Sequence, residues 1–171
     1  MLKVLITGPE SSGKSFLAEE LASFYKGGLI TEVARSYLNE KGSYQKEDLL
    51  KIARLQKSNE NLMISLNKHA IMFCDTGTEV IKIWSQEKYG RVDPEINQLN
   101  REQSYDIVLL CKPNIPWKQD PLRENPHDRM RLFQLYINEL KQTKSNFIVI
   151  DELIENRLSQ AIRIIDSHLE P

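Results

Sequence analysis

The 171-residue chain has little of what marks several specialised protein classes. Its 7 glycines and 7 prolines are too few for collagen or for low-complexity segments. Its 2 cysteines are too few for a disulfide-stabilised secreted scaffold. No apolar run approaches the roughly 20 residues that a transmembrane helix needs, so we expect no membrane partner. What is left is an ordinary globular chain, which agrees with its hydrophobic content of 40%.

The chain also lacks an excess of charge of either sign. Its 23 basic residues and 24 acidic residues give a net charge of −1. Binding duplex nucleic acid over a broad surface needs many uncompensated cations, so we expect no nucleic-acid partner. Residues 1–7 hold only a short apolar stretch and lack the features of a secretory signal, which predicts a cytoplasmic protein.

The few cysteines and histidines are not arranged as a metal site. Cys74 and Cys111 each follow an apolar run that reads as a buried strand, and we expect both to be reduced core thiols rather than a disulfide. The 3 histidines show no zinc-binding spacing with these cysteines.

Short apolar runs alternate with longer amphipathic segments along the chain. The predicted strands are residues 3–7, 29–31, 71–74, 107–111 and 147–150. The predicted helices are residues 14–25, 45–68, 79–88, 94–103, 128–143 and 154–169, and residues 113–126, with four prolines, are a predicted loop. The strands are continuously apolar, as parallel strands covered on both faces are. The pattern therefore predicts one doubly wound α/β domain over residues 1–171, with five parallel strands and helices on both faces.

One motif stands above the rest. Residues 8–15 read Gly-Pro-Glu-Ser-Ser-Gly-Lys-Ser, the Walker A pattern, between a predicted strand and a predicted helix. The glycines let several N–H groups point at phosphate oxygens, and the helix start adds its positive end. Lys14 would reach the β- and γ-phosphates of ATP, and Ser15 would offer its hydroxyl to Mg²⁺. The expected nucleotide contacts are Gly8, Glu10, Ser11, Ser12, Gly13, Lys14, Ser15 and Phe16.

A carboxylate at the end of another strand is expected to complete this site. Asp75 follows the apolar run 71–74, which is the Walker B arrangement, and would hold Mg²⁺ directly or through water. The alternative is that Asp75 caps the helix that follows it.

Further residues carry a resemblance to a known family. The phosphate loop, Glu32 with Arg35 and Tyr37, and Asp75-Thr76 occur in the same order as in the ribosylnicotinamide kinase domain of bifunctional nicotinamide-nucleotide adenylyltransferase/ribosylnicotinamide kinase proteins. Tyr105-Asp106, Pro116-Trp117, Asp120, Arg123 and Arg129 extend the similarity over nearly the whole chain. The Pro-Trp…Asp…Arg loop is the most specific of these matches.

The resemblance implies a P-loop kinase that transfers phosphate from ATP to the ribose 5′-hydroxyl of nicotinamide riboside. It implies the strand order 2-3-1-4-5 by analogy with kinases. Two positions differ from the family pattern: Gly77 stands where an acidic residue is usual, and Thr31 stands where an aromatic is usual. The nucleotidyltransferase His-x-Gly-His motif is absent, so the expected activity is that of a stand-alone kinase domain.

Glu32 and Arg35 are expected at the acceptor side. Ligands of α/β sheets bind beyond the carboxyl ends of the strands, where Glu32 falls. Glu32 would accept hydrogen bonds from ribose hydroxyls or take the proton of the attacking hydroxyl, and the alternative is a surface residue at a helix start. Arg35 would pair with Glu32 or reach the phosphoryl group.

The proline-rich loop supplies the remaining candidates. Trp117 would stack on a base or plug the core beneath the loop. Asp120 would bind substrate hydroxyls or orient Arg123, and solvent exposure is the alternative. Arg123 and Arg129 would act on the transferring phosphate when the loop closes, against the alternative of a solvated helix face. Trp84 reads as a core residue that could also line a nucleoside pocket.

The sequence thus predicts a kinase with Lys14, Glu32, Asp75, Arg123 and Arg129 as catalytic residues, ATP and Mg²⁺ as cofactors, and a nucleoside as the acceptor. Two alternatives stay open: a kinase for another nucleoside or small metabolite, and an ATP-hydrolysing switch that signals to a protein partner. Acceptor dependence of ATP consumption separates a kinase from a switch. The sequence does not determine the oligomeric state.

Overall fold

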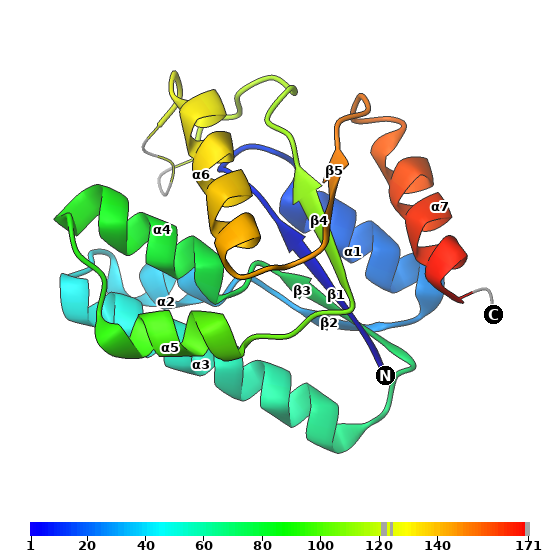
Figure 1. Cartoon of the computed structure of the whole chain (residues 1–171), viewed down its shortest axis with the longest axis horizontal. Coiled ribbons are helices and arrows are strands. Elements are labelled where there is room, and N and C mark those ends of the chain that lie inside the picture. The colour runs from blue at the N-terminus through cyan, green and yellow to red at the C-terminus, as the bar shows by residue number, and fades with distance from the viewer. Residues whose placement is uncertain (121–122, 124, 170–171) are drawn as a thin grey trace.

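The predicted strands and helices occur in the order that the apolar pattern gives, with one further helix between residues 33 and 41 (Figure 1). The computed structural model describes residues 1–120, 123 and 125–169. The strands are β1 (Leu2–Thr7), β2 (Gly28–Ile30), β3 (Ile71–Asp75), β4 (Ile107–Cys111) and β5 (Phe147–Ile150). The helices are α1 (Lys14–Tyr25), α2 (Val33–Lys41), α3 (Lys46–Leu66), α4 (Thr78–Tyr89), α5 (Pro94–Glu102), α6 (Arg129–Gln142) and α7 (Arg157–Leu169). Pro121 and Glu124, which belong to the predicted loop, lie outside the described residues.

The five strands form one parallel sheet in the order β2-β3-β1-β4-β5, which confirms the predicted order. Central β1 pairs with β3 on one side and β4 on the other, and Ile6 stands opposite Asp75. The end of β1 that leads into the phosphate loop is therefore flanked by the ends of β3 and β4. This arrangement brings loops that are distant in sequence to one edge of the sheet.

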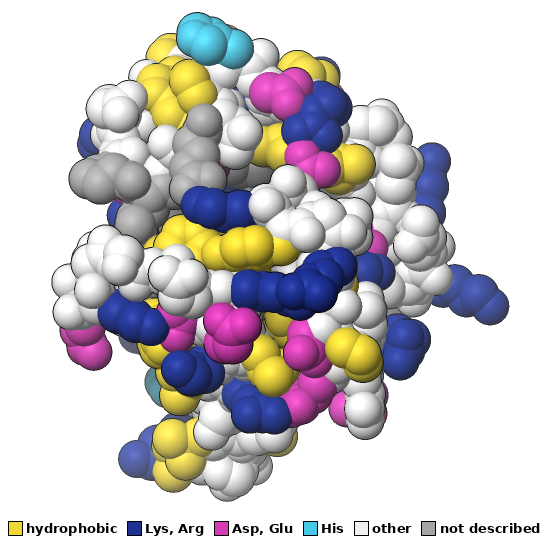
Figure 2. All heavy atoms as spheres, turned by 90° about the vertical axis from the view of Figure 1, so that its left-hand side faces the viewer, with side chains coloured by type: hydrophobic (Ala, Val, Ile, Leu, Met, Phe, Trp, Pro, Cys, Tyr) yellow, Lys and Arg dark blue, Asp and Glu magenta, His cyan; other side chains and the backbone are white. Residues whose placement is uncertain are grey.

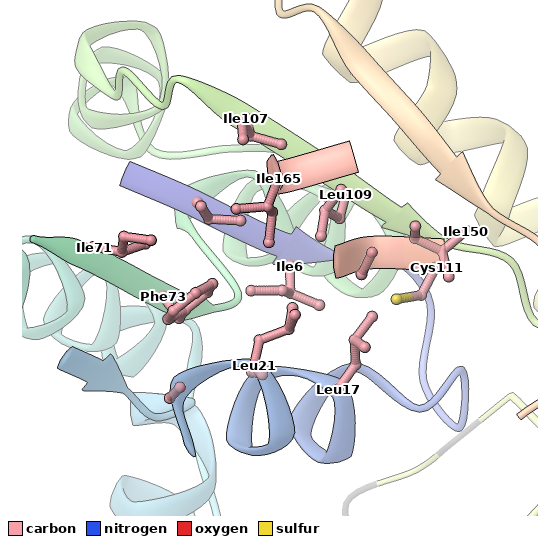
Figure 3. Packing of buried hydrophobic residues seen from close by; sticks show 14 residues of the cluster. Ile6, Leu17, Leu21, Ile71, Phe73, Ile107, Leu109, Cys111, Ile150 and Ile165 are labelled. Carbon is pink, nitrogen blue, oxygen red and sulfur yellow. The ribbon is translucent and has the colours of Figure 1, made fainter. Parts of the chain in front are cut away.

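Alternate residues of the central strands face opposite layers of helices. Val4 and Ile6 belong to the cluster packed against α1 and α7, which Figure 3 shows closely, whereas Leu5 belongs to the cluster on the other face. The same division holds for β3 and β4, where Phe73 and Leu109 face α1. Because helices cover both faces of the sheet, successive residues of the central strands are all apolar rather than alternately apolar and polar. Cys74 and Cys111 are buried and free, as predicted for core thiols.

The structure exposes several apolar side chains of the predicted helices and changes some element bounds. The exposed side chains include those of Phe16, Phe24, Leu62, Leu66 and Met130. Helix α2 is an element that the apolar pattern did not predict, because its nine residues carry few apolar positions.

The sheet edge departs from the predicted burial as well. In β5 the residues Phe147, Ile148 and Val149 keep part of their surface accessible, since an edge strand is covered less completely than a central one. Helix α7 begins at Arg157 rather than at Ile154. Within the described residues, no helix is long and apolar enough to cross a lipid bilayer.

Candidate active site

The phosphate loop lies between β1 and α1 and is held in a narrow space. Gly8 adopts φ +135°, and a side chain there would begin 2.5 Å from the backbone oxygen of Cys111 in β4. Gly13 adopts φ +82° at the N-cap of α1. Both positions require glycine because other residues rarely adopt such a backbone. The two motif glycines thus shape the loop that precedes the positive end of α1.

The polar groups of the loop are arranged for an anion. Lys14 donates its ammonium to the Pro9 carbonyl at 2.9 Å, close to the loop it would serve. Ser12 is fully buried, and its hydroxyl has no hydrogen-bond partner in the described part of the chain. Backbone amides and a lysine that converge on one concave loop form a binding site for phosphate groups.

Asp75 ends β3 directly beside the phosphate loop. Its side chain is buried, and its Oδ1 has no hydrogen-bond partner among the described residues. Burial raises the pKa of Asp75 to about 6, although the charge of Lys14 and a hydrogen bond from Ser15 oppose that rise. The N-cap of α4 is Gly77, so the alternative in which Asp75 caps this helix is wrong.

The pair of Asp75 and Ser15 fits a magnesium ion. A buried carboxylate oxygen without a partner is costly unless a cation or a donor approaches it. Carboxylate and hydroxyl oxygens, completed by phosphate and water, are the ligands that Mg²⁺ prefers.

Glu79 is a buried acid that the sequence analysis missed. It is fully buried in α4 and accepts hydrogen bonds from the Thr7 hydroxyl at 2.6 Å and the Gly77 amide at 3.2 Å. A side chain at Gly77 would begin 2.5 Å from Glu79 Oε2. The space next to Gly77, where the family pattern has an acidic residue, is therefore filled by the carboxylate of Glu79. This explains in physical terms why glycine stands at position 77.

The acceptor-side residues meet across the edge of the sheet. Glu32 is the N-cap of α2, and Arg35 Nε lies 3.7 Å from Glu32 Oε2. Arg35 Nη1 also donates to Asp120 Oδ2 at 2.8 Å. Of the two roles considered for Arg35, the structure contains the pairing with Glu32. Asp120 binds Arg35 with its side chain, whereas its backbone oxygen accepts from the Arg123 amide at 3.1 Å.

The loop between β4 and α6 packs against the phosphate loop through its arginines. Arg129 Nη1 donates to the Ser11 carbonyl at 2.9 Å, and Arg123 donates to the Lys118 carbonyl and approaches Ser11 Oγ at 3.5 Å. The guanidinium carbons of Arg123 and Arg129 lie 6.0 and 5.6 Å from the ring centre of Trp117. Trp117 is half-buried, and both guanidinium groups lie at distances typical of cation–π contacts with its ring.

Other loop contacts reach the same region. Glu10 accepts a hydrogen bond from the Asn125 amide. Arg131 pairs with Glu87 and Asp128 at an exposed position on α6, so it does not join the arginines at the phosphate loop.

A cleft of about 420 Å³ lies beside these groups, and Asp75, Asp120 and Arg129 are not among its lining residues. One end is the phosphate loop with Phe16, Arg123 and Lys118, and the middle holds Glu32 and Arg35. The other end is apolar and is lined by Ala34, Leu38, Val80, Ile83, Trp84 and Tyr136. Trp84, predicted as a core residue or a pocket wall, lines the cleft and donates its indole N–H to the Tyr44 hydroxyl at 2.8 Å. Trp117 and Thr31 are not among the lining residues.

The surrounding surface carries both signs of charge. The face in Figure 2 shows basic and acidic side chains interspersed around hydrophobic ones. This face therefore carries a mixed charge rather than a field of one sign.

A parallel five-stranded sheet in this order, with a Walker A loop after its central strand, defines a P-loop protein with a kinase-type fold. The family described as AAA domain matches residues 3–157, and the chain belongs to this family.

Individual relatives are more specific. The chain is 27% identical over 170 residues to the trifunctional NAD biosynthesis/regulator protein NadR of Escherichia coli K12, which covers 95% of this chain and 41% of that protein. The chain thus spans less than half the length of this curated relative.

Solved structures share the fold. A NadR protein in complex with NR superposes with a TM-score of 0.82 at 17% identity, covering 99% of this chain and 51% of that one. A NadR protein in complex with NAD and AMP-PNP gives 0.81 at 18% identity, covering 97% and 49%. Deoxyadenosine kinase from M. mycoides with bound dATP gives 0.67 at 17% identity, covering 97% of this chain and all of that one.

Proposed function

We propose that this domain transfers the γ-phosphoryl group of ATP to the 5′-hydroxyl of a nucleoside, and that nicotinamide riboside is the acceptor. The observation that carries the proposal is a continuous cleft lined by the phosphate loop, by Glu32 and Arg35, and by apolar residues that include Trp84. Its volume of about 420 Å³ is in the range of small-molecule sites. The similarity to NadR, one structure of which holds NR and another AMP-PNP, supports both substrates.

The phosphate end would bind and orient ATP. The loop amides and Lys14 would hold the β- and γ-phosphates, and Arg123 would stand over the transferring group. Asp75 and Ser15 would hold Mg²⁺, which when bound neutralises charge on the phosphate oxygens. Catalysis at such a site consists mostly of positioning and charge stabilisation.

The middle of the cleft would bind the ribose. Glu32 would accept the proton of the attacking hydroxyl as its oxygen forms a bond to the γ-phosphorus and the bond to the β–γ bridging oxygen breaks. Arg35 would keep the Glu32 carboxylate in place, since it contacts both Glu32 and Asp120. The flat indole of Trp84 gives the apolar end a wall on which an aromatic base can rest.

A kinase for another nucleoside is the second candidate. The similarity of fold to deoxyadenosine kinase, and Thr31 at the position where the family pattern has an aromatic residue, support it. An ATP-dependent switch stays as the alternative from another class. Because ATP is the phosphate donor, we propose the cytoplasm as the location, and residues 1–171 as one kinase domain.

The test is to incubate the protein with Mg·ATP and a panel of nucleosides that includes nicotinamide riboside, and to detect monophosphates by mass spectrometry. The control variant is Lys14→Ala. Nicotinamide mononucleotide formed by the native protein and absent with Lys14→Ala is the expected result. A different nucleoside monophosphate would identify that nucleoside as the acceptor. ATP consumption at the same rate with and without every acceptor would favour the switch.

A further inference from the structure

Arg157 is a buried arginine at the start of α7, outside the predicted catalytic set. Its side chain is 2% exposed. Nε donates to the Glu152 carbonyl at 3.0 Å, and Nη1 donates to the Ser12 carbonyl of the phosphate loop. Nη2 donates to the Lys112 carbonyl at 2.7 Å and to the Asn114 side-chain oxygen. One guanidinium therefore joins the phosphate loop to the β4–α6 loop and to the β5–α7 loop.

The bond to the Ser12 carbonyl affects the direction of an amide. In a trans peptide the carbonyl and the following N–H point in opposite directions. A donor that holds the Ser12 carbonyl on the outer side of the loop therefore directs the Gly13 N–H toward its inner side. Arg129 holds the preceding carbonyl, that of Ser11, at 2.9 Å, and in the same way directs the Ser12 N–H. Such inward amides are the donors that bind phosphate.

The charge of Arg157 also faces the loop. Nη1 lies 3.6 Å from the point where a side chain at Gly13 would begin. All four acceptors of the guanidinium are carbonyl or amide oxygens, so none of these bonds neutralises its charge. An arginine stays protonated even where burial lowers its pKa, as it does here. A full positive charge thus stands behind the Ser12–Gly13 peptide.

We propose that Arg157 is a positioning residue for the triphosphate of ATP, which orients the Gly13 amide and places a cation behind the phosphate loop. This inference rests on the ATP-binding part of the proposed function and is independent of the acceptor. The guanidinium of Arg157 has five N–H donors in a planar arrangement, so it can contact three loops at once, which the single ammonium of a lysine cannot do.

The experiment compares Arg157→Gln and Arg157→Lys with Arg163→Gln, which removes an exposed arginine from the same helix. Calorimetry measures the Kd of ATP and of inorganic tripolyphosphate without any acceptor, well below the melting temperature of each variant. We expect Arg157→Gln to raise both Kd values by about tenfold or more, by similar factors. Arg157→Lys should recover part of the loss, and Arg163→Gln should stay within about twofold of the native protein.

A spectroscopic signature separates positioning from general structural support. In the native protein, tripolyphosphate should shift the Gly13 amide proton strongly downfield, and in Arg157→Gln this shift should shrink. The inference is overturned if tripolyphosphate binds the variants as well as the native protein, or if only ATP binding weakens, since Arg157 would then act on the base and not on the phosphates. If Arg157→Gln does not fold, unchanged tripolyphosphate binding by Arg157→Lys overturns it equally. Because these measurements use no acceptor, they remain possible even if no acceptor for the kinase reaction is found.

Discussion

The two ends of the cleft are built in different ways. The phosphate end is formed by the backbone of the phosphate loop, which is closely packed against the central strands. Gly8 lies against Cys111 of β4, and buried Asp75 lies beside β1. The acceptor end includes charged side chains that are partly exposed, among which the Arg35 side chain is 40% exposed in its pair with Asp120. A site that must bind one invariant group can be rigid, whereas one that admits a varied acceptor can be assembled from surface contacts. We therefore expect changes at the phosphate end to have larger effects.

The largest effect is expected from Gly8→Ala. The new methyl group would meet the Cys111 carbonyl at 2.5 Å, and alanine would be strained at φ +135°. Because backbone surrounds this point, relief requires the loop or β4 to move. We expect a loss of stability on the order of 3 kcal/mol together with loss of ATP binding. Thermal unfolding and nucleotide titration measure both. Gly90→Ala, which meets nothing within 4 Å although its φ is also positive, is the matched control for strain alone.

Asp75→Asn should separate function from stability. We expect phosphoryl transfer to fall by roughly 10²–10³-fold, because a magnesium ligand and its charge are lost. The pKa of Asp75, raised to about 6 by burial, means that the folded state binds the proton more tightly than the unfolded state does. The ionised carboxylate therefore destabilises the fold as pH rises from about 4 through 6, and Asn removes this penalty.

The stability of Asp75→Asn without nucleotide should consequently exceed that of the native protein at pH 7, by about 3 kcal/mol, and should nearly match it at pH 4. Denaturant unfolding at both pH values is the measurement. A variant less stable than the native protein at pH 7 would mean that the contacts of the carboxylate with Ser15 and Lys14 outweigh the cost of its burial.

Asp48 tests the anchoring of the acceptor end. It lies in α3 and accepts hydrogen bonds from Lys41, the Gln45 amide, Tyr37 and Lys51, so it fastens α2, which carries Arg35. Hydrogen bonding from Lys41, above all, keeps the pKa of Asp48 well below its usual range. Its stabilising contribution is therefore present above about pH 4, the ordinary value for an aspartate, and is lost as pH falls below it.

Asp48→Asn should flatten the acid limb of the stability profile and raise the KM of the acceptor more than that of ATP. Glu47→Gln, at an exposed neighbouring position, is the control. An unchanged profile between pH 2 and pH 5, roughly the range of carboxylate titration, would contradict the anchoring role.

The phosphate end could be predicted from the sequence because most of its functional residues are consecutive in the chain. Gly8 through Ser15 form one motif, and Asp75 stands at the end of its strand. The parallel pairing of β1 and β3 therefore brings the motif and Asp75 together. Glu79 and Arg157 could not be predicted in this way. Arg157 contacts Ser12 from 145 residues away, and a lone arginine at a helix start gives no sign of what it holds. Trp84 was ambiguous because helical spacing cannot distinguish a core wall from a cleft wall.

The smallest effect is expected at the Arg35–Asp120 pair. The bond is short, at 2.8 Å, but Arg35 is 40% exposed and water screens the pair. A double-mutant cycle of Arg35→Ala and Asp120→Ala should therefore give a coupling of only about 0.5 kcal/mol in unfolding. Both single variants should instead share one kinetic effect, a higher KM for the acceptor with the KM for ATP unchanged, since the pair joins α2 to the β4–α6 loop and Arg35 also contacts Glu32. If either variant raised the KM of ATP as much as the KM of the acceptor, the two ends of the cleft would not act as separate regions.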